Sequence, residues 1–169
     1  MRNKVFFILG GGGHTAQMIL LQEKFPDEKY EKHFIVATGD TLSENRVKEL
    51  GCYFIHKVDR YKETEDSLFI ATIKNILLLR IVRQLLQSKN IVELMNKDIL
   101  ISAGPNTGIF VFIIAKLMGN FCVYVESWSR RKKLSKTGSL LKYFSNLFFV
   151  QWEDLRDENK HFIYKGRLL

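Results

Sequence analysis

The length, composition and charge of the chain limit what it can be. Its 169 residues suffice for one domain with a sizeable core and are too few for two, and an apolar content of 46 % excludes a disordered protein. The longest apolar run, residues 109–115, is far shorter than the ~20 residues of a membrane-spanning helix. The net charge of +8 indicates an anionic partner: a nucleic acid, a phosphate-bearing ligand or an acidic membrane face.

Strand and helix patterns alternate along the chain. The predicted strands are short and almost wholly apolar, and they lie at residues 4–9, 34–37, 53–56, 99–102, 121–125 and 148–150. Helical patterns occupy residues 14–24, 43–50, 68–87, 107–118 and 139–145, and residues 60–66 form a polar loop. This alternation predicts an α/β fold with a Rossmann-like parallel sheet and helices on both faces.

Three of the predicted loops follow strands and contain unusual residues. In parallel α/β sheets, ligands bind at the carboxyl ends of the strands. The loops at residues 10–15, 102–107 and 126–137 are therefore the candidate functional regions.

The first of these loops reads GGGGHT and leads into a helix. Glycines let the backbone approach a ligand closely, and free N–H groups at the start of a helix attract phosphate. The loop is not a P-loop, because no Lys-Ser/Thr pair follows, and Thr15 occupies the third glycine position of a dinucleotide fingerprint. A tight turn without a ligand is the alternative. His14 could be a general base at the ligand or only begin the helix.

The second and third loops carry turn-forming and charged residues. Gly104 and Pro105 fix a turn, after which the chain can cap the next helix or cradle a sugar with its backbone. Glu126 ends an apolar strand, where an unpaired buried carboxylate would be costly. The basic run that follows is either a solvated loop or a site for anionic headgroups or a diphosphate, and it consists of Arg130, Arg131, Lys132, Lys133 and Lys136.

Two further segments allow alternative interpretations. The helix at residues 68–87 can pack in the core or lie in a membrane interface, because cations stand beside a broad apolar surface. The tail at about 152–169 can pack on its own domain or dock a partner.

Metal and cofactor chemistry are not expected. Cys52 and Cys122 lie in apolar strand-like segments, which is typical of buried free thiols in a reducing compartment. No two of the four histidines have helical metal-ligand spacing.

Five motifs together resemble one family. GGGGHT, SAGPNTG, YVES, LSKTG and FFVQWEDL occur in that order over nearly the whole chain. They resemble the non-catalytic, membrane-recruiting subunit of the UDP-N-acetylglucosamine transferase of asparagine-linked glycosylation, and bacterial polysaccharide subunits. The resemblance implies that residues 1–169 form one domain equivalent to the amino-terminal, acceptor-side half of a GT-B glycosyltransferase. A separate donor-binding subunit would then supply the UDP-sugar, and the acceptor would be a polyprenyl-diphosphate-linked sugar.

The resemblance also implies roles for particular residues. His14 and Glu126 would lie beside the acceptor hydroxyl, and one of them would take its proton. The acceptor and its phosphates would contact Gly11, Gly12, Gly13, Thr15, Gly104, Asn106, Thr107 and Ser127. An anionic membrane surface would contact Arg130, Arg131, Lys132 and Lys133. The partner interface would include Trp152, Leu155, Leu168 and Leu169.

The implied protein is a subunit at the cytoplasmic face of the membrane, held there peripherally, since the chain starts at its first strand where eukaryotic family members commonly carry an anchor. N-acetylglucosamine is the expected sugar. An autonomous Rossmann-type nucleotide- or phosphate-binding enzyme is the first alternative, but the acidic ribose-binding residue and a complete catalytic set are missing. The interpretation as a nucleic-acid-binding module is supported by the net charge alone, and such a module is not expected.

Overall fold

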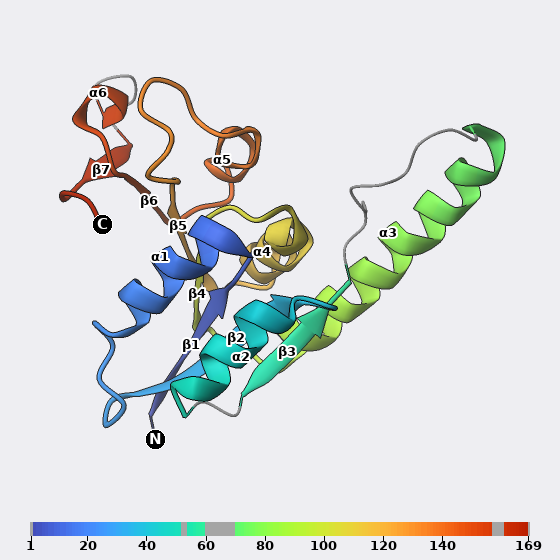
Figure 1. Ribbon diagram of the computed structural model, residues 1–169, viewed down its shortest axis with the longest axis horizontal. Coiled ribbons are helices and arrows are strands. Elements are labelled where there is room, and N and C mark those ends of the chain that lie inside the picture. The colour runs from blue at the N-terminus through green and yellow to red at the C-terminus, as the bar shows by residue number, and fades with distance from the viewer. Residues whose placement is uncertain (1, 52–53, 60–69, 157–160, 169) are drawn as a thin grey trace.

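The computed structural model describes residues 2–51, 54–59, 70–156 and 161–168. Among these residues, seven strands form one parallel sheet in the order β3-β2-β1-β4-β5-β6-β7 (Figure 1). The strands are β1 (Asn3–Ile8), β2 (Tyr30–Ala37), β3 (Ile55–Val58), β4 (Ile99–Ser102), β5 (Phe121–Val125), β6 (Leu147–Val150) and β7 (Phe162–Tyr164). The chain changes direction across the sheet between β1 and β4, which is the switch point where such folds bind ligands.

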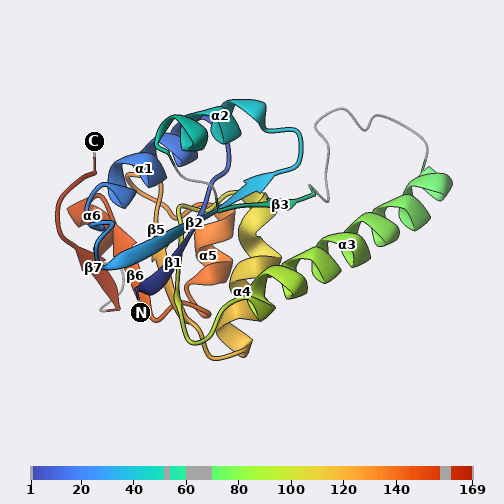
Figure 2. The ribbon, with the colours of Figure 1, turned by 90° about the horizontal axis from the view of Figure 1, so that it is seen from below.

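Helices cover both faces of the sheet (Figure 2). They are α1 (Gly12–Gln22), α2 (Thr41–Glu49), α3 (Ile70–Glu93), α4 (Ile109–Leu117), α5 (Lys136–Leu141) and α6 (Glu153–Arg156), with a short 3-10 turn η1 (Asn106–Gly108). Alternate residues of β1 serve the two faces: Val5 and Phe7 join the core under α1 and α2, whereas Phe6 and Ile8 join the core under α3, α4 and α5. The near-continuous apolar strands follow from this double burial.

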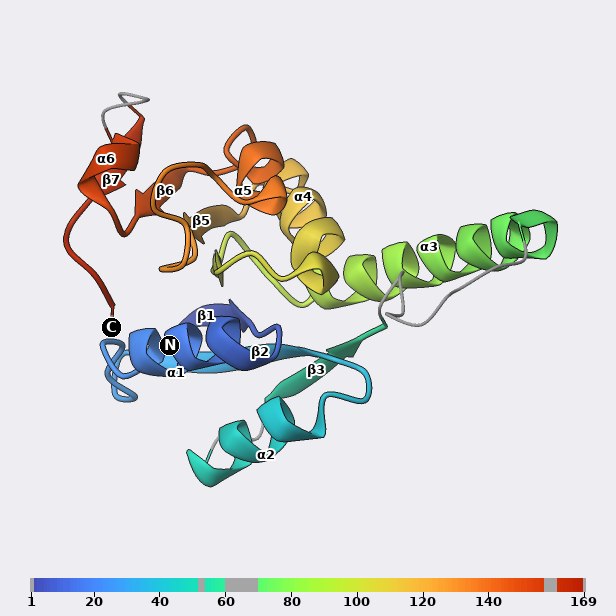
Figure 3. The same ribbon diagram turned by 45° about the horizontal axis from the view of Figure 1, so that its top comes forward.

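Helix α3 projects beyond the body of the domain (Figures 1 and 3). Of the side chains described in α3, those of Ile91 and Val92, near its carboxyl-terminal end, join the hydrophobic core. Earlier in the helix, Leu79 and Leu86 are exposed. Among the described residues, none of the helices has the length and hydrophobicity required to cross a bilayer.

The sheet also has a poorly covered area on the face that carries α1 and α2. An apolar groove of about 430 Å³ lies over β4, β5 and β6 on that face. Its floor includes Ile101, Val123 and Phe149, and its walls come from α1 and from the tail at residues 165–168. We call this cavity the sheet groove.

The predicted parallel α/β fold is confirmed. The predicted tail differs most, because its residues Phe162–Tyr164 form β7 on the edge of β6. Helix α5 begins at Lys136, earlier than predicted, because the Ser135 hydroxyl accepts the Gly138 N–H and caps it. Cys122 is a buried free thiol as expected, and burial raises its pKa to about 12, whereas Cys52 lies outside the described residues.

Candidate functional site

The three predicted loops meet at the carboxyl edge of the sheet. They follow β1, β4 and β5, which are adjacent strands. Gly10 of the first loop packs so closely on Pro105 of the second that a side chain at Gly10 would overlap it. The Thr137 hydroxyl, at the start of α5, donates to Asn106 Oδ1 at 3.2 Å. The arrangement expected from parallel strand order is therefore present, and these loops form one continuous surface.

The glycine turn presents open backbone at the start of α1. Gly11 and Gly12 have φ values of +71° and +52°, a region that favours glycine. Gly12 and Gly13 are exposed, and α1 has no side-chain cap. The first N–H groups of a helix have no intrahelical partner, so this turn offers donors to an anion.

Thr15 shapes the turn from within. It is 1 % exposed, and its hydroxyl oxygen accepts the Gly11 N–H at 3.0 Å. Ser43 gives its own proton to Asp40 at 2.9 Å, so the Thr15 proton goes to Ser43 Oγ, 2.8 Å away. Thr15 therefore has no donor left for a phosphate, and its predicted ligand contact is replaced by a structural one.

His14 stands beside the glycine turn with an unused ring nitrogen. Its Nδ1 is buried and lacks a hydrogen-bond partner among the described residues. Burial lowers the pKa of His14; the Ala103 backbone and the Glu126 charge partly oppose this, and the Arg130 charge adds to it. The imidazole is therefore neutral at pH 7 and can accept a proton.

Glu126 has a different environment from His14. It is fully buried, and its Oε1 accepts the Ser127 N–H at 2.8 Å. Its Oε2 accepts both the N–H and the hydroxyl of Ser135, at 3.0 and 3.1 Å. A side chain at Gly138 would overlap Oε2. Both oxygens of the carboxylate are therefore used in holding the loop after β5 in place.

The second loop is held rigidly by buried contacts. Gly104 has φ +93° and packs against the Tyr124 hydroxyl, where a methyl group would overlap. Its N–H donates to Ser102 Oγ at 3.1 Å. Thr107 is 9 % exposed, and its carbonyl accepts Gln84 Nε2 of α3 at 3.0 Å. Of the residues predicted to bind the acceptor in this loop, Asn106 is the exposed one.

The basic run is exposed beside this surface. Arg130 lies close enough to His14 for its charge to act on the imidazole. Arg131 Nε lies 3.7 Å from Asp154 Oδ2, and the Arg131 guanidinium also packs on the Trp152 ring, 5.1 Å from its centroid. The sequence did not single out Trp128, whose Nε1 comes within 3.4 Å of the position of a side chain at Gly13. A tryptophan in a basic loop carries no motif by which it could have been recognised.

The tail residues separate into core and surface. Leu155 is fully buried in the same core as Phe148 and Phe162, so its predicted position at a partner interface is wrong for the folded domain. Leu168 lines the sheet groove, and its N–H donates to Gln151 Oε1 at 3.0 Å. Trp152 is half-buried under Arg167, whereas Leu169 lies outside the described residues.

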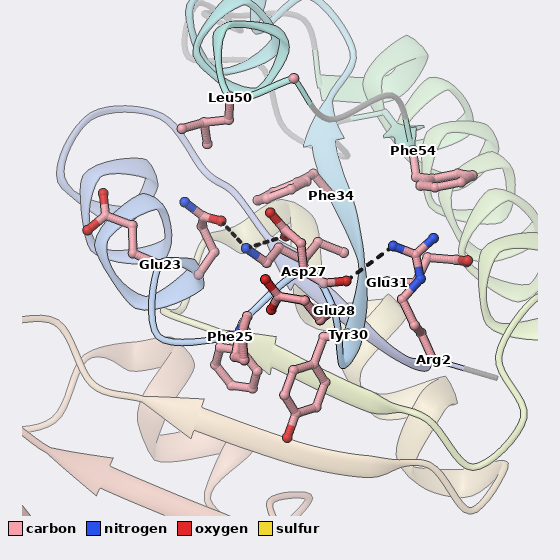
Figure 4. Close-up of a pocket in the computed structure, with 14 residues that line it drawn as sticks. Arg2, Glu23, Phe25, Asp27, Glu28, Tyr30, Glu31, Phe34, Leu50 and Phe54 are labelled. Carbon is pink, nitrogen blue, oxygen red and sulfur yellow. Dashed lines mark hydrogen bonds and ion pairs between the residues drawn. The ribbon is translucent and has the colours of Figure 1, made fainter.

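A separate cavity of about 560 Å³ lies at the opposite edge of the sheet, where β2 begins (Figure 4). Several of its polar groups are paired within the cavity. Lys32 contacts Asp27 at 2.8 Å and Gln22 at 2.9 Å, and Arg2 donates to the Asp27 carbonyl at 3.1 Å. None of the three loops reaches it, so it is not part of the site.

Comparison with known proteins gives one family and one fold. The family described as "Oligosaccharide biosynthesis protein Alg14 like" matches residues 5–168. The "UDP-N-acetylglucosamine transferase subunit ALG14" of Homo sapiens is 25 % identical, with 98 % of this chain and 82 % of that protein covered. The Schizosaccharomyces pombe subunit of the same name is 30 % identical, with 96 % and 80 % covered.

Two solved structures share the fold. Acinetobacter baumannii MurG superposes with a TM-score of 0.68 at 14 % identity, covering 90 % of this chain and 42 % of that one. A UDP-N-acetylglucosamine 2-epimerase superposes with a TM-score of 0.64 at 15 % identity, covering 99 % and 49 %. The chain thus spans less than half of each of these two proteins. Because the family match extends over nearly its whole length, the chain belongs to the family of Alg14-like oligosaccharide biosynthesis proteins.

Proposed function

We propose that this chain is the acceptor-binding subunit of a two-subunit glycosyltransferase that transfers N-acetylglucosamine from its UDP-sugar to a polyprenyl-diphosphate-linked sugar. The observation that carries the proposal is the meeting of an open glycine turn, a neutral His14 and the cation Arg130 at one sheet edge. Open N–H groups and a guanidinium suit a diphosphate. The names of the relatives, each called a subunit of a UDP-N-acetylglucosamine transferase, support both the sugar and the need for a second subunit.

In this proposal His14 acts on the acceptor hydroxyl. The hydroxyl oxygen attacks the anomeric carbon of the UDP-sugar, the bond from that carbon to the diphosphate oxygen breaks, and UDP leaves. The hydroxyl proton passes to the neutral imidazole of His14. General-base assistance of this kind contributes ~100- to 10,000-fold. Glu126 keeps the loop after β5 in place and takes no proton.

The donor-binding subunit covers the sheet groove. A parallel sheet normally has both faces buried, and over β4, β5 and β6 this domain leaves one face lined by apolar side chains. Leu168 forms part of the wall, so the tail contributes to the interface from the edge of the groove. Because the tail is also hydrogen-bonded to Gln151, its deletion would disturb the domain as well as the interface.

A matched pair of substitutions tests this interface. Phe121 lines the groove and is 42 % exposed, whereas Leu140 of α5 is 43 % exposed and lies outside the groove. Phe121→Glu should weaken the free energy of binding to the donor subunit by ~2 kcal/mol or more, so that the two proteins no longer co-purify. Leu140→Glu should leave the binding unchanged. Equal effects of the two variants would place the interface elsewhere.

Membrane association belongs to another surface. Exposed apolar residues of α3, namely Leu79 (69 %), Val82 (44 %) and Leu86 (58 %), stand beside Arg83, which is exposed and forms an ion pair with Asp59 at 2.7 Å. In Figure 1 the basic loop after β5 and the amino-terminal end of α3 both lie on the upper side of the molecule, toward which the strands point, and they are well separated along its long axis. Cations beside apolar side chains suit an anionic bilayer interface.

Vesicle flotation tests this surface. Replacing Arg130, Arg131, Lys132 and Lys133 with Gln should weaken binding to anionic vesicles, since each cation is worth ~1 kcal/mol at such a surface. Leu79→Ser with Leu86→Ser should weaken it further, and Phe121→Glu should not. Unchanged flotation of both sets of variants would place the membrane contact on another surface of the chain.

Calorimetry tests the function itself. The purified chain should bind a short-chain prenyl-diphosphate N-acetylglucosamine and should not bind UDP-N-acetylglucosamine. In the complex with the donor subunit, His14→Ala should lower kcat at least tenfold, while His161→Ala, at an exposed histidine, should not. Binding of the nucleotide sugar alone would favour an autonomous nucleotide-binding enzyme.

A further inference from the structure

Trp128 lies at the edge of the glycine turn, in the loop that follows β5. Its Nε1 is 3.4 Å from the point where a side chain at Gly13 would begin. The side chain is 46 % exposed, and its N–H has no hydrogen-bond partner among the described residues. An indole with an unused donor therefore borders the surface on which a ligand of the glycine turn would lie.

The backbone around this side chain is ordered by three contacts. Trp152 Nε1 donates to the Trp128 carbonyl at 2.6 Å. The hydroxyls of Ser127 and Ser129 are 3.0 Å apart, and the Arg130 N–H donates to the Ser127 carbonyl at 2.9 Å. The exposed ring is thus presented by a closed turn, which reduces the entropy that it loses when a ligand packs on it.

We propose that Trp128 positions the acceptor, with its N–H edge toward the diphosphate at the glycine turn and its ring packed against the adjoining sugar. The inference rests on the function proposed above and adds a residue that determines acceptor affinity. A pyranose ring presents C–H groups on its faces and hydroxyls at its rim. An indole complements such a sugar, because the indole has an apolar face and one polar N–H. A tryptophan side chain also has few torsion angles to immobilise on binding.

The role of Trp128 predicts a graded effect on acceptor binding. By calorimetry with a short-chain prenyl-diphosphate N-acetylglucosamine, Trp128→Ala should raise Kd about 10- to 30-fold. Trp128→Phe should recover part of the loss, because it keeps a ring and lacks only the N–H. Tyr143→Ala removes a 75 % exposed aromatic residue from a loop after α5 and should have no effect.

Fluorescence and kinetics distinguish contact between Trp128 and the acceptor from a purely structural role of Trp128. The chain has two tryptophans, so the emission change on acceptor binding should disappear in Trp128→Phe, where Trp152 remains. In the two-subunit complex, Trp128→Ala should raise the KM for the acceptor tenfold and leave the KM for UDP-N-acetylglucosamine and kcat within twofold.

The two proposals fail in different ways. If Trp128→Ala binds the acceptor as tightly as the wild type while the wild type binds it well, Trp128 is not a binding residue and the proposed function stands. If the wild-type chain does not bind the acceptor at all, both proposals are wrong.

Discussion

Two glycines with positive φ angles allow the close packing of the second loop to be tested. Gly104 has φ +93° and Gly119 has φ +83°. A side chain at Gly104 would overlap the hydroxyl of the fully buried Tyr124, whereas one at Gly119 would meet nothing within 4 Å. Alanine at either position is destabilised by the positive φ, by about 1–2 kcal/mol. At Gly104 the overlap adds the cost of overpacking a core, about 1–3 kcal/mol.

The free energy of unfolding should therefore fall by about 1–2 kcal/mol in Gly119→Ala and by about 2–5 kcal/mol in Gly104→Ala. For a chain of this length, each kcal/mol corresponds to about 2–4 °C in Tm. Urea titration at fixed temperature measures both values. Gly104→Ala should also lose transfer activity in the two-subunit complex, because Tyr124 contacts Ser135 at 3.2 Å and Ser135 holds Glu126. Equal destabilisation by the two substitutions would refute the reasoning.

Three further predictions concern charged groups. Glu126→Gln should cost about 2–4 kcal/mol of stability, because an amide cannot accept hydrogen bonds at both Oε1 and Oε2; an unchanged urea midpoint would contradict this. Because the pKa of His14 is lowered below 6.5, chiefly by burial, the acid limb of the kcat/KM profile should lie below pH 6.5, and a limb above that value would exclude His14 as the base. Burial, followed by the charges of His33 and Lys4, lowers the pKa of His56 below 6.5. The unfolded chain therefore protonates His56 more readily than the folded chain does, and the free energy of unfolding should fall as the pH drops below 6.5. His56→Leu should flatten this slope in a Tm series from pH 7.5 to 5.5, and an unchanged slope would assign the dependence to other groups.

The position of the site followed from the sequence because it depends on strand order and periodicity. Apolar strands alternating with helices place the loops after β1, β4 and β5 at one edge, and the glycines mark the loop whose backbone is exposed. Glu126 could also be expected to need a partner, since it ends an apolar strand.

The roles within the site were harder to predict because they depend on contacts distant in sequence. Glu126 bonds Ser135, nine residues later, and Thr15 bonds Ser43 of α2, and neither pairing leaves a local pattern. The apolar run Phe162–Tyr164 lies in the segment predicted to dock a partner, but it pairs with the edge of β6 as a strand. Trp128 lies in no sequence motif, and its proximity to Gly13 depends on the folding of two loops that are far apart in the chain.

Transfer by reconstituted subunits tests the central claim most directly. Labelled UDP-N-acetylglucosamine and a short-chain prenyl-diphosphate N-acetylglucosamine are incubated with this chain, with the donor-binding subunit, and with both. Product should form only in the mixture, and it should be lost when the chain carries His14→Ala. Turnover by this chain alone, or by the donor subunit without it, would contradict the account of an acceptor-side half.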